Sequence, residues 1–164
     1  MKRITYTNTL NYRRNTYVDR TPYYIPEIDR WRNHGELCEH IVKNHRGIMT
    51  EANPNTAFNI GSDIESEHAS VKSSRFGLAD NFGGATTVSD AIKYYFNNVA
   101  SSIFIYVVFN EETQIVTEYQ MNKREFGKFI NLFSSPYIHK KNKKIEIRGR
   151  KDSKKMIKWL EAQC

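Results

Sequence analysis

The apolar run Ile103–Phe109 constrains the fold of this chain more than any other stretch. Seven consecutive apolar residues suit a strand and fall far short of the roughly 18 that a membrane-spanning helix needs. A strand with no polar positions has to be covered on both faces, as in a sheet that carries helices on either side. The sequence therefore predicts a mixed α/β or α+β domain with a central sheet.

Periodic patterns place the other elements around this strand. Apolar residues at helical spacing predict four helices: from Glu27 or Gly35 to about His45, from residues 86–89 to about Val99, over 123–133, and from Asp152 or Ser153 onward. Further strands are expected at residues 57–60, 69–73, 114–121 and around Ile145–Ile147. The predicted order is helix, two or three strands, helix, two strands, helix, strand, helix.

Length and composition favour one cytoplasmic globular domain. A chain of 164 residues with 39% hydrophobic content can bury a core of its own. The N-terminus has a basic start but no apolar segment of the kind that secretory signals carry. The two cysteines, Cys38 and Cys164, have no metal-binding spacing and are too few for a disulfide framework. We therefore expect a cytoplasmic protein with no membrane partner.

Residues 1–34 are basic and rich in tyrosine, and Pro22 and Pro26 interrupt regular structure. Arginines interleaved with aromatic rings could form an arm along a nucleic acid. The same segment could equally be an extended chain packed on the domain surface. We favour the packed segment, because tyrosine often serves as an amphipathic cover.

The net charge of +7 is concentrated near the C-terminus. Residues 1–138 hold equal numbers of basic and acidic side chains, whereas 139–164 hold ten basic and three acidic ones. Such a patch attracts polyanions by releasing counterions, although a solubilising tail has the same composition. The candidate DNA contacts in this segment are Lys140, Lys141, Lys143, Lys144, Arg148 and Arg150.

The stretch Asn59–Arg75 carries the chemistry. Asp63 follows a short apolar run, and Lys72 lies in a strand-like segment with Ser70 two residues before it. A carboxylate that holds a divalent cation, beside a lysine that steadies a nucleophile or a developing charge, could support phosphodiester cleavage. The alternative is a β-hairpin with a solvated acidic tip that includes Glu65 and Glu67.

These residues resemble the PD-(D/E)xK nuclease superfamily, which includes restriction and homing endonucleases. The resemblance lies in Gly-Glu-x-x-Glu at 35–39, followed by Ile-Val and Gly47, then a carboxylate after a strand and a lysine on the next strand. It covers about residues 35–110 and implies an α-β-β-β-α-β core. Residues 1–34 would then be an N-terminal arm, and 111–164 an extension with a basic end.

The resemblance assigns roles to individual residues. Asp63 matches the metal-binding aspartate of the family, Lys72 its lysine, and Glu39, with Glu36 close behind, its first-helix glutamate. Ser70 stands where the family has Glu, Asp or Gln. The residues that could supply the missing acid are Glu39, Glu67, Asp80 and Asp90, and those that could contact phosphate beyond the lysine are Ser73, Ser74 and Arg75.

The function implied is Mg²⁺-dependent hydrolysis of double-stranded DNA, with Mn²⁺ as a possible substitute. A restriction or homing enzyme that binds its site as a homodimer suits a small domain with a basic tail. One alternative is a non-catalytic nucleic-acid-binding module that retains the nuclease fold. Another is a protein-interaction or structural domain whose carboxylates are surface charges.

Overall fold

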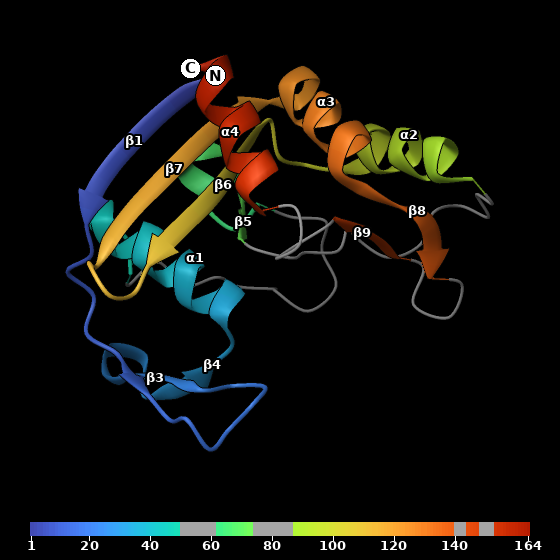
Figure 1. Ribbon diagram of the computed structural model, residues 1–164. Coiled ribbons are helices and arrows are strands. Elements are labelled where there is room, and N and C mark those ends of the chain that lie inside the picture. Colours follow the sequence, from blue (N-terminus) through green and yellow to red (C-terminus); the bar gives the residue numbers. More distant parts are fainter. Residues whose placement is uncertain (50–61, 74–86, 140–143, 148–152) are drawn as a thin grey trace.

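The fold is centred on a four-stranded mixed sheet (Figure 1). The computed structural model describes residues 1–49, 62–73, 87–139, 144–147 and 153–164. The strands of the sheet run in the order β1 (Lys2–Thr7), β7 (Ile115–Asn122), β6 (Ile103–Asn110) and β5 (Ala69–Ser73). β5 runs parallel to β6, and the other two pairings are antiparallel. The expected mixed α/β architecture with a central sheet is confirmed.

Helices cover both faces of this sheet, and β6 alternates between them. Phe104 and Tyr106 pack with α2 (Val88–Asn98) and α3 (Lys123–Phe133). Ile105 and Val107 point to the other face and pack with α1 (His34–His45). The last helix, α4 (Ser153–Gln163), adds Met156 and Leu160 to the α2–α3 side. The apolar run is therefore buried on both faces, as predicted.

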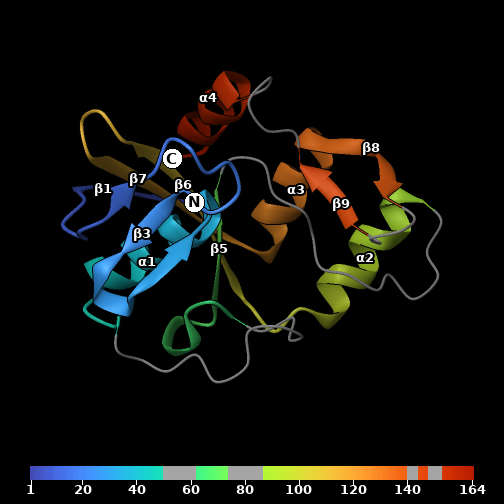
Figure 2. The same cartoon turned by 90° about the horizontal axis from the view of Figure 1, so that it is seen from below.

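Two smaller sheets flank this core. The first, which we call the N-terminal sheet, contains β2 (Arg13–Arg14), β3 (Tyr23–Ile25) and β4 (Arg30–Arg32). A short 3-10 turn, η1 (Pro26–Ile28), joins β3 to β4. The N-terminal sheet lies on the side of α1 remote from the central sheet (Figures 1 and 2), and Tyr23 and Ile25 pack in the α1 cluster. The second small sheet pairs β8 (Ser134–His139) with β9 (Lys144–Ile147).

The N-terminal residues pack against the domain. β1 pairs with β7 over its whole length, from Lys2 opposite Gln120 to Thr7 opposite Ile115. The sequence did not predict β1, the N-terminal sheet or β8. The strand expected at 57–60 lies outside the described residues. Within the described part of the chain, no helix has the length and apolar character needed to cross a bilayer.

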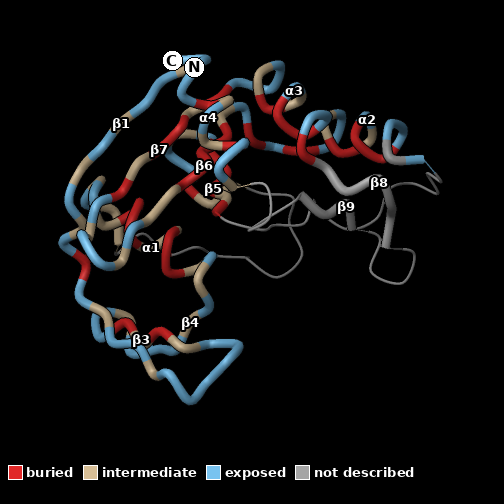
Figure 3. The backbone as a smooth tube through the Cα atoms, viewed as in Figure 1, coloured by how far each residue is buried: buried red, intermediate tan, exposed pale blue. Residues whose placement is uncertain are grey.

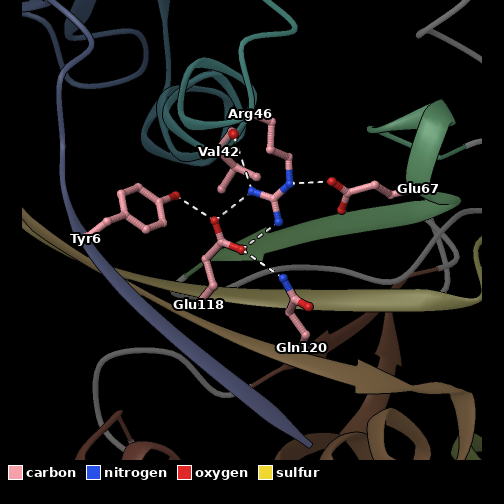
Figure 4. Close-up of polar contacts among 6 residues, drawn as sticks. All are labelled: Tyr6, Val42, Arg46, Glu67, Glu118 and Gln120. Carbon is pink, nitrogen blue, oxygen red and sulfur yellow. Dashed lines mark hydrogen bonds and ion pairs between the residues drawn. The ribbon is translucent and has the colours of Figure 1, made fainter.

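A buried polar network ties α1 to the sheet (Figure 4). Glu118 of β7 is fully buried, and its two oxygens accept from Nη1 and Nη2 of Arg46, both at 2.8 Å. Tyr6 of β1 donates to the same carboxylate at 2.6 Å, and Gln120 donates at 3.2 Å. Arg46 Nε also donates to Glu67 at 2.7 Å. The network therefore joins β1, β7, the end of α1 and the turn before β5.

The network predicts a loss of stability in acid. Burial alone would raise the pKa of Glu118, but hydrogen bonds from Arg46 and Tyr6 outweigh it and hold that pKa below its usual range. The resulting stabilisation is present above the unfolded-state pKa of about 4.3 and is lost as pH falls through the folded-state pKa. We expect Glu118→Gln to unfold more easily than the parent at neutral pH and to lose less stability on acidification. Urea unfolding across this pH range measures both effects, and Glu112→Gln, at an exposed turn residue, should follow the parent.

Candidate active site

Asp63 lies against β5 because the chain reverses tightly between them. The turn contains the 3-10 segment η2 (Glu65–Glu67) and His68 in the left-handed region, and Ile64 bridges to Ala69. The reversal brings Asp63 Oδ2 to within 2.7 Å of the Val71 backbone nitrogen, which donates to it. The Ser70 hydroxyl donates to the same oxygen at 3.2 Å. Among the described strands β5 lies at the edge of the sheet, so this carboxylate caps an N–H that no neighbouring described strand takes up.

Lys72 and Ser70 share one face of β5. Ala69 and Val71 belong to the cluster that packs under α1, and side chains alternate along a strand, so Ser70 and Lys72 point to the other face. The Lys72 side chain is half-buried. Among the described carboxylates, none forms an ion pair with it. Its ammonium group is therefore not engaged by a described carboxylate and could contact an anionic ligand.

Glu39 of α1 is the second carboxylate at this edge. Helix α1 begins at the cap Asn33, whose side chain accepts from the backbone of Glu36, and it packs against β5. Burial raises the pKa of Glu39, and the negative charge of Asp63 raises it further, while Lys43 and Lys72 act in the opposite direction. Asp63, Lys72 and Glu39 are therefore electrostatic neighbours at the edge of the sheet.

Lys43 is the closest partner of Glu39, with Nζ 2.9 Å from the carboxylate, and is itself buried. A buried lysine is rare unless it is paired. The Lys43–Glu39 ion pair offsets part of the repulsion between the Glu39 and Asp63 carboxylates. The sequence analysis missed Lys43. Its spacing of four from Glu39 on a helix was the available signal.

The other predicted carboxylates are engaged elsewhere. Glu36 is partly exposed, pairs with Arg32 Nε at 3.2 Å and accepts from Asn33 at 2.9 Å. Glu67 belongs to the Arg46 network. Glu36 is thus engaged by Arg32 and Glu67 by Arg46, whereas Glu39 is the glutamate whose pKa the charge of Asp63 raises.

Asp90, one of the candidates for the acid that Ser70 lacks, is held at the start of α2. Asp90 lies exposed in the first turn of α2, where its backbone nitrogen donates to the cap Thr87. The α2 residue near Asp63 is Tyr95, whose pKa is raised by burial and by the charge of Asp63. Asp80 lies outside the described residues. Ser70 itself contributes a hydroxyl to the site rather than a charge.

Ser73, which was predicted to contact DNA, is buried in the structure. Ser73 is buried on the side of β5 that faces α1, and its hydroxyl lies 3.9 Å from the position that a Cβ on Gly35 would take. A hydroxyl beneath a helix cannot reach a phosphate, so this role for Ser73 is wrong. Lys144 lies in β9, and its side chain is not described. The remaining candidates, Ser74, Arg75, Lys140, Lys141, Lys143, Arg148 and Arg150, lie outside the described residues.

Two carboxylates and a hydroxyl form a small oxygen-donor set. Within the described ranges, no three His, Cys, Asp or Glu side chains form a group that could hold a metal ion. Mg²⁺ does not require one, because it commonly binds through one or two carboxylates and completes its shell with water and substrate phosphate. The negative charge of Asp63 raises the pKa of Glu39, and a cation between the two carboxylates would offset this repulsion. The residues present are therefore compatible with Mg²⁺ or Mn²⁺.

Comparisons with protein families, with curated proteins and with solved structures find no significant match to this chain. The described fold and site define a mixed α/β protein with an acidic pair and a lysine at one sheet edge. Its function has to be inferred from the geometry and chemistry of those residues.

Proposed function

We propose that this protein is a metal-dependent DNA endonuclease of the PD-(D/E)xK type. The observation that carries the proposal is the Asp63 carboxylate, which the Val71 backbone and the Ser70 hydroxyl hold on β5 beside Lys72 in sequence, and whose charge acts on Glu39 of α1. Asp63, Glu39 and Lys72 come from a turn, a helix and a strand. Their electrostatic proximity is unexpected for scattered surface charges, which face solvent separately.

Each residue would have a distinct role. Asp63 and Glu39 would hold Mg²⁺ or Mn²⁺, with the Ser70 hydroxyl beside them. The bound ion would neutralise phosphate charge and lower the pKa of a water. Lys72, on the Ser70 face of β5, would orient that water or offset charge on the phosphate. The bond from the Val71 backbone would fix the Asp63 carboxylate before substrate arrives.

The chain order supports this assignment. Helix α1 precedes the Asp63 turn, and β5 continues through α2 into the parallel buried strand β6. A lysine strand followed by a helix and a parallel strand is compatible with the second half of the nuclease core. The strand expected at 57–60, which would precede Asp63 in that core, lies outside the described part of the chain.

A homodimer would present two such sites to the two strands of double-stranded DNA, which suits a site-specific enzyme of the restriction or homing type. The competing function is a non-catalytic nucleic-acid-binding module. Two observations favour it: Ser70 supplies no charge, and the Lys43 ammonium already neutralises Glu39. Cleavage assays separate the two functions, because only the enzyme requires the metal.

We expect the purified protein to nick supercoiled plasmid with Mg²⁺ or Mn²⁺ and to leave it intact in the presence of a chelator. Asp63→Ala and Lys72→Ala should each abolish nicking, because one removes a metal ligand and the other the charge beside the phosphate. The helix-surface variant Lys93→Ala should retain activity. Metal-independent nicking, or full activity in either site variant, would contradict the proposal, and binding without cleavage would favour the non-catalytic module.

A further inference from the structure

The outer face of the N-terminal sheet carries a row of cationic and aromatic side chains. Arg13, Tyr24 and Trp31 are direct cross-strand neighbours on β2, β3 and β4. The guanidinium of Arg13 lies 4.6 Å from the centre of the Tyr24 ring, and the Trp31 ring centre is 5.3 Å from that of Tyr24. The inner face is occupied, because Tyr23 and Ile25 pack against α1. The row is therefore a preassembled surface on the solvent side of the domain.

Exposure shows that no other described part of the chain covers this face (Figure 3). Trp31 is 41% exposed and Tyr17, in the adjoining β2–β3 loop, is 96% exposed. Large exposed aromatic residues grouped on one face commonly mark a binding surface. Trp31 belongs to neither hydrophobic core cluster, so its side chain adds little to the packing of the fold. Contact with a ligand would explain a tryptophan in this position.

Charge identifies the class of ligand. Residues 8–33 hold five arginines against three carboxylates. Of the four arginines in the strands, Arg13 shares the face of Tyr24 and Trp31, whereas Arg14, Arg30 and Arg32 lie opposite Tyr23 or Ile25 on the inner face. Arg14 and Arg32 pair with Glu111 and Glu36. Among the described residues, no carboxylate pairs with Arg13, Arg20 or Arg30. Arginine beside flat aromatic rings suits phosphates together with sugars or bases.

We propose that the outer face of the N-terminal sheet is a DNA-binding surface. Arg13 contacts the phosphate backbone, and Trp31 packs against a sugar or base ring. This inference extends the proposed function and depends on it in one respect, the choice of DNA as the ligand. The surface is separate from the Asp63 group, so binding here does not require cleavage or a metal.

The test is DNA binding without divalent cations, by fluorescence anisotropy of a labelled duplex. We expect Arg13→Ala/Trp31→Ala to bind roughly tenfold more weakly or worse. The dependence of log affinity on log salt should become shallower by about one unit for the lost arginine. Arg124→Ala, an exposed arginine on α3 across the central sheet, is the matched charge control, and Trp159→Phe controls for the loss of an indole. Both controls should bind as the parent does.

Single variants keep the test independent of folding. Arg13→Ala and Trp31→Phe remove one contact each, and thermal melting shows whether they remain folded. Parent-like binding in the folded double variant overturns the proposal, as does a parent that binds no DNA. A parent dimer that the double variant disrupts, with DNA affinity unchanged, identifies an interface between copies instead and also overturns it. Weakened binding in a protein that never nicks plasmid supports this surface while contradicting the nuclease activity.

Discussion

Arg46→Met is expected to destabilise the protein by about 3–5 kcal/mol. The substitution keeps much of the side-chain volume but leaves the fully buried Glu118 carboxylate without its cation. Tyr6 and Gln120 still donate hydrogen bonds to the Glu118 carboxylate. The loss of stability therefore comes from leaving its negative charge in the protein interior without a cation. Urea unfolding at neutral pH measures this loss, which is a large fraction of the free energy of unfolding of a typical domain.

The matched control is Arg32→Met, the same substitution at a partly exposed ion pair. Arg32, at the end of β4, pairs with Glu36 in the first turn of α1, an interaction worth about 0–1 kcal/mol. In the double variant Arg46→Met/Glu118→Leu no buried charge remains, so we expect part of the stability to return. Equal losses at Arg46 and Arg32 would contradict the role assigned to the network, and so would a double variant no more stable than Arg46→Met.

Local sequence patterns correctly predicted the helices and strands whose own apolar residues mark the face that is buried. The helix expected over 123–133 matches α3, because Phe126, Phe129, Ile130 and Phe133 form one buried stripe. The strand expected at 69–73 matches β5. β1 was missed because only part of its pattern is apolar. Its pairing with β7 joins residues more than 100 positions apart, which no local signal contains.

The candidate site shows the same limit. Spacing and family resemblance selected Asp63, Lys72 and two glutamates of α1, and they ranked Glu39 only slightly ahead of Glu36. The choice depends on which side of α1 packs against β5: Glu39 is half-buried and its pKa is raised by the charge of Asp63, while Glu36 pairs with Arg32. Glu118 was read as one residue of a strand, because its partner Arg46 lies 72 positions away.

Asp63→Asn should separate activity from stability. The side-chain oxygen of an asparagine can still accept from the Val71 backbone, so the turn before β5 should remain intact. Removing the charge also removes the repulsion that helps to raise the pKa of Glu39, so that pKa should fall. We therefore expect an apo protein at least as stable as the parent. Its Mg²⁺-dependent nicking rate should fall by at least about a hundredfold, since metal-assisted charge stabilisation is worth several kcal/mol.

Three measurements make this prediction specific: thermal melting without metal, the shift in melting temperature on adding Mg²⁺, and the nicking rate. A ligand that binds only the folded state raises the melting temperature, so the parent should respond to Mg²⁺ and Asp63→Asn should not. Glu36→Gln removes a carboxylate three residues before Glu39 on the same helix, and it should keep both the shift and the rate. If Asp63→Asn lost activity only in step with its stability, Asp63 would be a structural cap of β5. If it kept the parent's nicking rate, the metal would have to bind elsewhere.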